Sequence, residues 1–592
     1  MKNTRAPRTV VRWGVLVAGA LESLCWLALS AGLAAAAEAV VVTYPAPQGE
    51  TRSPDYTVTV DGKPVDVYVA QVRPGMVTNG GPYSFAYFDF SGTVEVEIST
   101  EKPLDQLRIQ PLSKGIIPAV SGHTMRFSLS APAQLSIEPD RKIGPLLLFA
   151  NPLEEDAPQP GDPGVVYYGP GSYRPNRINL RSNQTLYLAG GAVVKAAVNV
   201  QGTNIAIRGR GILDGTDWPQ WNGPQGHMVQ IEQSRNVLVE GIIVRGSWAW
   251  TVVPAGSDSV TIQNLKICGS RVESDDGIDI VNSQHVFIRD SFIRTDDDCI
   301  APKGMGYGNR NTEDIQISHC VFWTDRAHIW RIGCESRAAA MRDIVSRDID
   351  VVHWVRAWFF TGPVVASLQP AEDMPLENVR FEDIRVNGEA TATAGQKFLI
   401  EVQPQFTQWA VKKTPGRVRK VSFRNFVVYG DSSEDLGRIL VRGPDSLHTV
   451  EGVTFENVVR YGVTTLQGSP RLDVADYASK VVFLAETPST AVDGDWRAVP
   501  TLFALDPAFP NPANPATTIP YLLPGAVAVR LEVYDLLGQR VAVLVDQVQG
   551  AGYHQVVWDG RSETGATTSS GVYLYRLQAR TFSATRKLLL VK

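Results

Sequence analysis

Short runs in which apolar and polar residues alternate fill most of this chain of 592 residues. A period of two is typical of a β-strand that buries one face, and the wider spacing of an amphipathic helix is almost absent. Near the N-terminal end, the runs 56–60 and 65–69 flank the turn Asp61-Gly62, which predicts a β-hairpin. Similar runs continue to residue 137. We therefore predict an all-β protein in which residues 40–148 form an N-terminal β-sandwich.

A repeated pattern follows between residues 149 and 486. Each repeat begins with a polar residue and continues with alternating apolar positions, as in Asn236-Val-Leu-Val, and the next three repeats begin after 23, 26 and 29 residues. A single repeat cannot bury its apolar face, whereas a stack of repeats encloses a continuous core. The spacing is shorter than the roughly 40–50 residues of a propeller blade. This region is therefore predicted to be a parallel β-helix, with loops of unequal length bordering a cleft.

The two ends of the chain have a different composition. At the N-terminus, positive charges precede an apolar stretch and Ala35-Ala-Ala37, which is typical of a secretory signal over residues 1–37. Glu22 interrupts the apolar stretch and disfavours a permanent membrane anchor. Residues 487–502 have the Pro, Ala and Thr content of a linker. Alternating runs and turns then predict a C-terminal β-sandwich over residues 503–592.

The charge and the cysteines limit the possible partners. The net charge is −5, and residues 1–37 hold four basic residues and one acidic residue, so the rest of the chain carries −8. This balance argues against nucleic acid or an anionic membrane as the main partner. We find no zinc-type spacing and no phosphate-binding loop, so we assign no metal or cofactor, and we expect a monomer. Four cysteines follow the signal, and they are either buried free thiols or include one bridge: Cys268, Cys299, Cys320 and Cys334.

Two groups of acidic residues lie within the repeats. The first contains Asp275 and Asp276, the second contains Asp297 and Asp298, and Asp276 and Asp297 are 21 residues apart, about one repeat. On adjacent coils, whose strands lie roughly 4.8 Å apart, both groups would face the same side. Glycoside hydrolysis needs one protonated and one ionised carboxyl, and close carboxylates push their pKa values apart. Calcium binding is the alternative for such a group.

The acidic groups resemble two motifs of a known family. Ser274-Asp-Asp-Gly-Ile-Asp279 and Asp297-Asp-Cys-Ile-Ala301 are similar to motifs of glycoside hydrolase family 28, the polygalacturonase family of right-handed parallel β-helices. The resemblance implies an inverting hydrolase with a right-handed β-helix. It implies that Asp297 is the general acid, and that Asp276 and Asp298 hold and activate the attacking water.

The resemblance covers roughly residues 165–465 and extends to other positions. It implies that His328, where the family has Gly-His-Gly, hydrogen-bonds a catalytic carboxyl. The family's Arg-Ile-Lys motif, which binds the carboxylate of galacturonate, corresponds here to Arg356-Ala-Trp-Phe-Phe360. Arg356 is then the candidate carboxylate partner, because Trp358 and Phe359 cannot pair with a carboxylate. This departure puts a pectin substrate in doubt.

Further substrate contacts are expected beside the acidic motifs, where tryptophans can stack on sugar faces and polar groups can bind hydroxyls. These candidates are Trp250, Trp330, Asp275, Lys303 and Arg331. A sandwich before a β-helix is also similar to glycoside hydrolase family 49, which includes dextranases that cleave neutral α-glucans. We therefore expect a polysaccharide substrate and polygalacturonase-like hydrolysis. The alternatives are dextranase-like hydrolysis, a β-helical polysaccharide lyase and a non-catalytic surface glycan binder.

The C-terminal unit resembles the sorting domains of type IX secretion and the Ig-like domain of flagellar hook-capping proteins. The similar segments are Phe509-Pro-Asn-Pro, Val533-Tyr-Asp-Leu-Leu-Gly538 and Trp558-Asp-Gly-Arg561. The resemblance implies an Ig-like β-sandwich over residues 503–592 that engages type IX-like secretion machinery. It also implies a bacterial protein that is secreted or attached to the cell surface.

Overall fold

The computed structural model describes most of the chain after the predicted signal. The described residues are 39–75, 80–354, 364–387, 398–430, 437–485, 504–505, 508, 513, 517–523, 527–549, 552–580 and 582–590. The predicted signal, the predicted linker and Arg356 lie outside them. Strands dominate the described part, in which one short 3-10 helix, η2, covers Leu112–Lys114. Among these residues no helix has the length and apolar character needed to cross a membrane.

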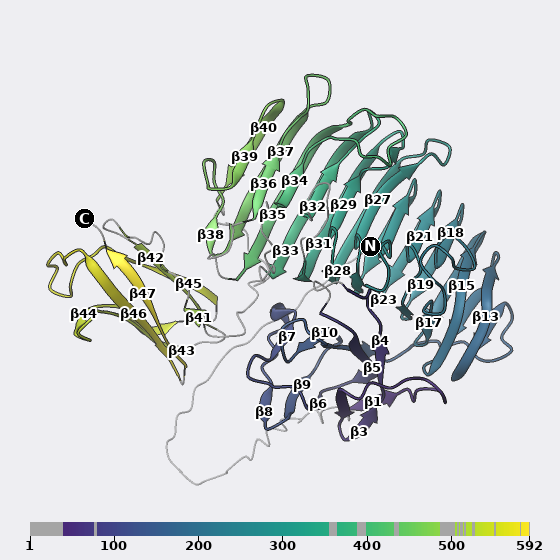
Figure 1. Cartoon of the computed structure of the whole chain (residues 1–592), viewed down its shortest axis with the longest axis horizontal. Helices are drawn as coiled ribbons and strands as arrows, with labels where there is room; N and C mark the ends of the chain where they lie inside the picture. Colours follow the sequence, from purple (N-terminus) through teal and green to yellow (C-terminus); the bar gives the residue numbers. More distant parts are fainter. Residues whose placement is uncertain are drawn as a thin grey trace, which may run out of the picture. The chain divides into compact units, whose positions relative to one another are not determined.

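The N-terminal unit is a sandwich of two sheets around an apolar core (Figure 1). One sheet contains β1 (Val40–Thr43), β4 (Val67–Ala70), β5 (Tyr83–Ser91), β7 (Arg108–Gln110), β10 (Ala133–Glu138) and β11 (Leu146–Pro152). The other contains β2 (Tyr56–Val60), β3 (Lys63–Val65), β6 (Val94–Thr100), β8 (Ala119–Ser121) and β9 (Thr124–Leu129). The predicted hairpin is formed by β2 and β3.

The strand β5 is buried on both faces, because the first sheet of the sandwich also packs against the β-helix. Tyr83 and Phe149 are among the sandwich side chains in this second core, which Phe292 and Trp323 of the β-helix complete. The guanidinium of Arg294 lies 4.0 Å from the ring centre of Tyr83 and 3.9 Å from that of Trp323. The sandwich therefore shares a core with the β-helix.

Twenty-nine strands, β12 to β40, form the continuous, almost entirely parallel sheet of the β-helix. Those before the acidic groups are β12 (Val165–Tyr168), β13 (Gly171–Leu180), β14 (Thr185–Leu188), β15 (Ala192–Val200), β16 (Thr203–Gly209), β17 (Ile212–Asp214), β18 (Val229–Glu232), β19 (Arg235–Glu240), β20 (Ile243–Arg245), β21 (Val252–Ala255), β22 (Asp258–Gln263) and β23 (Lys266–Cys268). The central ones are β24 (Ile278–Val281), β25 (Gln284–Arg289), β26 (Phe292–Thr295), β27 (Ile300–Met305), β28 (Thr312–Thr324), β29 (Trp330–Gly333), β30 (Ser336–Arg337) and β31 (Met341–His353). The last are β32 (Val364–Gln369), β33 (Pro375–Asn387), β34 (Phe398–Val402), β35 (Arg417–Tyr429), β36 (Arg438–Val441), β37 (Val450–Arg460), β38 (Val463–Thr464), β39 (Leu472–Val474) and β40 (Ala478–Leu484).

The apolar positions of the repeats stack on one another from coil to coil. One inward-facing ladder consists of β-branched residues, which favour extended backbone. It runs through Ile205, Val237, Val260, Val286, Ile315, Ile344, Val379, Val421, Val453 and Val481. Farther along, Phe381, Phe423, Phe455 and Phe483 stack face to face with ring centres 4.8 to 5.2 Å apart. The four cysteines are buried free thiols.

The polar residue that begins each repeat has a conformational role. Asn236, Ser259, His285 and Asp314 have φ values of 54°, 58°, 54° and 50°, in the left-handed region. Short polar side chains tolerate this region better than most others, because they can hydrogen-bond locally. The amide of Asn236 also donates to the side chain of Asn204 at 2.8 Å. These residues therefore turn the chain at equivalent points of successive coils.

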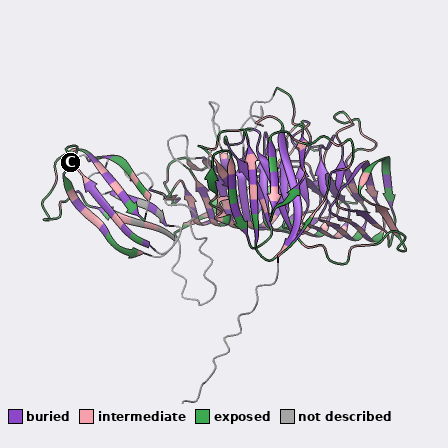
Figure 2. Cartoon of the chain, turned by 90° about the horizontal axis from the view of Figure 1, so that it is seen from below, coloured by how far each residue is buried: buried purple, intermediate pink, exposed green. Residues whose placement is uncertain are grey.

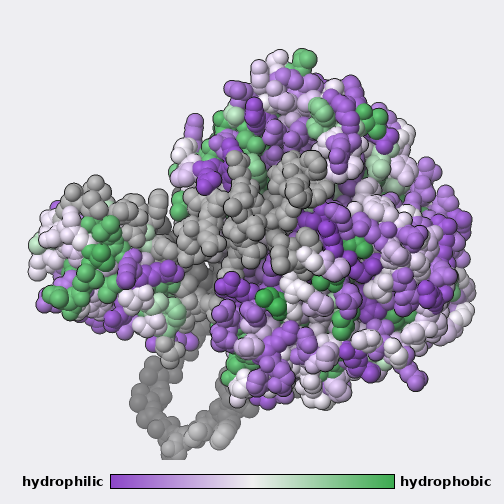
Figure 3. Space-filling view, in the orientation of Figure 1, coloured by the Kyte–Doolittle hydropathy of each residue, from purple (hydrophilic) through white to green (hydrophobic). Residues whose placement is uncertain are grey.

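The C-terminal unit is a second sandwich, with its own core around Tyr521, Trp558 and Tyr575. Its sheets consist of β41 (Ala504–Leu505), β42 (Thr517–Leu523) and β45 (Gly552–Trp558), and of β43 (Val527–Tyr534), β44 (Arg540–Gln549), β46 (Gly571–Ala579) and β47 (Phe582–Leu590). Buried and exposed residues alternate along its strands (Figure 2). Some hydrophobic side chains gather on the visible surface of this unit (Figure 3). The predicted β-helix with flanking sandwiches is thus confirmed.

Candidate active site

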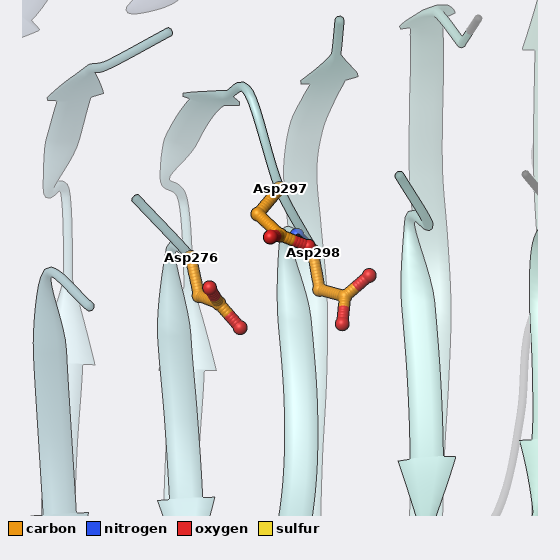
Figure 4. Close-up of side chains that lie close together, drawn as sticks. All are labelled: Asp276, Asp297 and Asp298. Carbon is orange, nitrogen blue, oxygen red and sulfur yellow. Dashed lines mark hydrogen bonds between the residues drawn. The ribbon is translucent and has the colours of Figure 1, made fainter. Parts of the chain in front are cut away.

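The acidic groups lie just before two neighbouring strands of the β-helix. Asp276 precedes β24 by two residues, and Asp298 precedes β27 by two residues. Because Ile278 pairs with Ile300, Asp276 and Asp298 occupy equivalent positions on adjacent coils. Asp297 lies one position earlier, on the connection to β27 (Figure 4). The structure thus places both groups on one side, with Asp298 rather than Asp297 in register with Asp276.

Equivalent positions on five successive coils carry polar or aromatic side chains. In order, they are His227, Trp250, Asp276, Asp298 and His328. One oxygen from each of the three aspartates lies within 4.8 Å of the others, and all three residues are buried. Such a group of carboxylates could hold a divalent cation. Three basic side chains, Lys303, Arg326 and Arg331, contact the same carboxylates and already offset their charge.

Asp298 is held in its ionised form. Its Oδ1 accepts hydrogen bonds from Nδ1 of His328 at 2.7 Å and from the backbone N–H of His328 at 3.0 Å. Nη1 of Arg331 lies 3.7 Å from its Oδ2. Burial alone raises the pKa of Asp298, but His328 and Arg331 outweigh burial and hold the pKa below the ordinary value for an aspartate. This carboxylate is therefore a base at neutral pH.

Asp297 has the opposite tendency. Burial raises the pKa of Asp297 well above its ordinary value, and the negative charges of Asp276 and Asp298 raise it further. Arg326, whose Nη2 lies 2.9 Å from Oδ2 of Asp297, opposes this rise without reversing it. At 8% exposure, Asp297 is also the most accessible of the three aspartates. The carboxyl that burial tends to keep protonated is therefore also the one of the three that is most open to solvent.

Asp276 shares a lysine with a further carboxylate. Nζ of Lys303 lies 3.2 Å from Oδ2 of Asp276 and 2.8 Å from Oδ1 of Asp279. Burial raises the pKa of Asp276, Lys303 lowers it and the charge of Asp298 raises it, with a net upward shift. The same Nζ lies 3.7 Å above the ring centre of Trp250. Lys303 is therefore part of the charge balance of the cluster.

The two tryptophans predicted to stack on sugars differ in their surroundings. The ring of Trp250 stacks on His227, with ring centres 4.8 Å apart and an angle of 6°, and the ammonium of Lys303 lies 3.7 Å from its ring centre. Trp330 is 0% exposed and packs edge-on against Phe322 and Phe381 in the core. The prediction that Trp330 is a sugar platform is therefore wrong, because its ring points inward. Trp250 is partly exposed, and its contact with a sugar stays a prediction.

Two other residues predicted to contact substrate, Asp275 and Arg331, lie next to the acidic cluster. Asp275 is 0% exposed and accepts backbone N–H bonds from Asp296 at 2.7 Å and from Arg271 at 2.9 Å. It ties the two acidic loops together from a fully buried position, and its contact with substrate stays a prediction. Burial, and the charge of Asp296, raise the pKa of Asp275 to about 8. Arg331 lies beside Asp298, with its guanidinium 5.6 Å from the ring centre of Trp409.

Several residues of the site had no prediction. Arg326 lies two positions before His328, and its Nε lies 2.7 Å from Oδ2 of Asp296, a neighbour of the catalytic motif. Trp221 and Trp409 are 55% and 39% exposed near the two ends of this row of side chains. The acidic motif pointed to Asp296, but nothing in the sequence around the two tryptophans indicated that they lie near His227 and Arg331.

Comparisons with known proteins agree with this geometry. Residues 179–349 match the model of the glycosyl hydrolases family 28, and this segment contains all three aspartates and His328. This part of the chain is therefore similar to a glycoside hydrolase domain. Residues 511–583 match the model of the FlgD Ig-like domain, which confirms the Ig-like character of the C-terminal unit.

Known proteins resemble parts of this chain at low identity. A "Probable polygalacturonase" of Vitis vinifera is 24% identical over 168 residues, which cover 26% of this chain and 33% of the length of that relative. The structure of Dex49A from Penicillium minioluteum is similar over 75% of this chain and 96% of its own, with 14% identity and a TM-score of 0.54. A family 28 exopolygalacturonase from Yersinia enterocolitica covers 76% of this chain and 97% of its own, with 14% identity and a TM-score of 0.40. The likeness to Dex49A supports the fold.

Proposed function

We propose that this chain is an inverting glycoside hydrolase in which Asp297 is the general acid and Asp276 and Asp298 hold and activate water. The observation that carries the proposal is the opposite behaviour of neighbouring carboxyls. Asp297 is kept protonated by burial and by its two neighbours, while His328 and Arg331 keep Asp298 ionised. One protonated carboxyl and one ionised carboxylate in the same site are the two states that cleavage of a glycosidic bond requires. The inverting course rests on the resemblance to family 28.

The steps follow from these protonation states. Asp297 donates its proton to the glycosidic oxygen as the bond between that oxygen and the anomeric carbon breaks. A water molecule attacks the anomeric carbon from the opposite face and gives a proton to Asp298 or Asp276. The oxygens of these two residues lie within 4.8 Å of each other, a gap that one water can bridge with two hydrogen bonds of about 2.8 Å. Arg326 and Lys303 stay paired with the carboxylates throughout.

The charge of the site favours a neutral glycan as substrate. Lys303 is shared by Asp276 and Asp279, and Arg326 by Asp296 and Asp297. A uronate would bring another negative charge to each sugar ring beside these carboxylates, and the cations that contact them are already paired. We therefore place a dextranase-like action on a neutral α-glucan ahead of polygalacturonate hydrolysis for this chain.

The experiment that tests this function is a reducing-end assay on a panel of polysaccharides, with dextran, pullulan, polygalacturonate and rhamnogalacturonan included. We expect new reducing ends from a neutral glucan and none from polygalacturonate. Proton NMR of the first product should show the anomer opposite to that of the cleaved linkage. An ultraviolet-absorbing unsaturated product would establish a lyase. Binding without any cleavage would establish a glycan binder. Retention of the anomeric configuration would mean that an aspartate, rather than water, attacks the anomeric carbon first.

We expect a bell-shaped dependence of kcat/KM on pH. Activity should fall as the pH rises through the elevated pKa of Asp297, because the acid loses its proton. It should also fall at low pH as Asp276 is protonated, and this limb should lie above the ordinary aspartate pKa of about 3.9, since the pKa of Asp276 is raised. Initial rates on the identified glycan across a buffer series check both limbs. A plateau that extends to alkaline pH would contradict the assignment of Asp297.

We also propose that the enzyme is exported from a bacterial cell and is either released or attached to the cell surface. The charged and apolar pattern of residues 1–37 and the resemblance of residues 503–592 to type IX sorting domains support this proposal.

A further inference from the structure

A loop of the N-terminal sandwich reaches the acidic cluster of the β-helix. Arg73 follows β4, and its backbone N–H donates to the carbonyl of Ser270 at 2.7 Å. Its Nη1 lies 3.2 Å from Oδ2 of Asp296 and 3.7 Å from Oε1 of Glu273. The side chain of Asp296 is 0% exposed, so the guanidinium of Arg73 ends at a fully buried carboxylate. Residues 223 positions apart in the sequence are thus joined at the site.

The chain of contacts continues from Asp296 to the general acid. Oδ2 of Asp296 also accepts a hydrogen bond from Nε of Arg326 at 2.7 Å. Nη2 of the same arginine lies 2.9 Å from Oδ2 of Asp297. The side chain of Arg326 is 2% exposed, which excludes bulk water from both contacts. Arg73, Asp296, Arg326 and Asp297 therefore form a row in which positive and negative groups alternate.

The alternating charges decide how strongly Arg326 favours the ionised form of Asp297. An arginine paired with a single buried carboxyl favours the ionised form, which is the wrong form for a general acid. Asp296 takes a share of the charge of Arg326. Burial raises the pKa of Asp296 to about 6, and Arg326 and then Arg73 oppose this rise. The other charged groups that face Asp297 or Asp296 are Asp276, Asp298, Arg331, Asp275 and Asp325.

We propose that Arg73 is a positioning residue of the active site: the N-terminal sandwich fixes Asp296 through Arg73 and thereby sets, through Arg326, the geometry and protonation of Asp297. The inference rests on the proposed function of Asp297 as the general acid. It gives the sandwich a part in catalysis in addition to its part in the shared core.

The test compares Arg73→Met, Arg73→Lys and Asp296→Asn in the full-length protein, on the glycan that the panel identifies. Arg126→Met is the matched control, because Arg126 belongs to the same sandwich and pairs with Glu97 at 2.6 Å on the surface. We expect Arg73→Met to lower kcat on the order of tenfold or more with little change in KM. The alkaline limb of the kcat profile should move to lower pH in Asp296→Asn, since Arg326 then offsets the charge of Asp297 without sharing it with Asp296. In Arg73→Met, Asp296 keeps its hydrogen bond to Arg326, so the limb should move by less.

The outcomes separate this inference from the proposed function. Recovery of most activity in Arg73→Lys and wild-type behaviour of Arg126→Met would support it. A wild-type kcat and pH profile in folded Arg73→Met would overturn it while leaving the hydrolase intact. If Arg73→Met does not fold, as judged by circular dichroism, Asp296→Asn decides: an alkaline limb at lower pH supports the inference, and an unchanged limb overturns it. A wild-type enzyme that cleaves no glycan in the panel would overturn the proposed function, and this inference with it.

Discussion

Replacing Asp297 by Asn is expected to lower kcat on a natural glycan on the order of a hundredfold or more, because the general acid is removed. The folded structure should survive the change. The Asn side-chain oxygen can still accept from Arg326, which remains paired with Asp296, and the new side chain has nearly the same shape. Initial rates at the optimum pH, with circular dichroism of both proteins, provide the measurement.

The leaving group gives this variant a sharper test. In an aryl glycoside with an acidic phenol, the phenolate leaves without being protonated. The fall in kcat caused by Asp297→Asn should therefore be much smaller on this substrate than on the glycan. Asp314→Asn is the matched control, because Asp314 turns the chain at a coil edge with its side chain 38% exposed. Equal losses on both substrates would mean that Asp297 acts in another way than as the acid.

The general fold could be predicted because its causes are local. The alternation of apolar residues fixes which side chains face inward, and the polar residue that begins each repeat fixes where the chain turns, as Asn236 and Asp314 do with φ values of 54° and 50°. Stacking of equal repeats then follows from the need to bury the apolar face. The acidic motifs were visible for the same reason, since a spacing of one coil brings Asp276 and Asp298 into register.

The rest of the site depends on strand register, side-chain direction and packing between units, which the spacing of residues along the sequence does not determine. Repeats of 21 and 22 residues are both plausible coils, so only the pairing of Ile278 with Ile300 decides that Asp298, rather than Asp297, lies opposite Asp276. Whether a tryptophan near a motif faces the core or the cleft changes with a shift of one residue. Arg73 lies 223 residues from Asp296 in the sequence, and only the packing of two separate units brings them together.

Trp330 offers the clearest test of this one-residue ambiguity. Truncation of Trp330 to Ala is expected to lower the free energy of unfolding by about 3–5 kcal/mol, because it leaves a large cavity between Phe322 and Phe381. If Trp330 were instead a sugar platform, the Trp330→Ala protein would bind the glycan more weakly and keep its stability. The midpoint of urea unfolding, followed by circular dichroism, and the KM for the glycan measure the two effects separately.

Trp221→Ala is the matched control, since Trp221 is 55% exposed and meets His227 edge-on with ring centres 6.3 Å apart. Its loss should change the free energy of unfolding by less than about 0.5 kcal/mol. A raised KM with unchanged stability in Trp330→Ala would contradict the core position. A large loss of stability in Trp330→Ala alone would confirm that the residue before Arg331 points inward, which leaves Arg331 itself on the outer face beside Asp298.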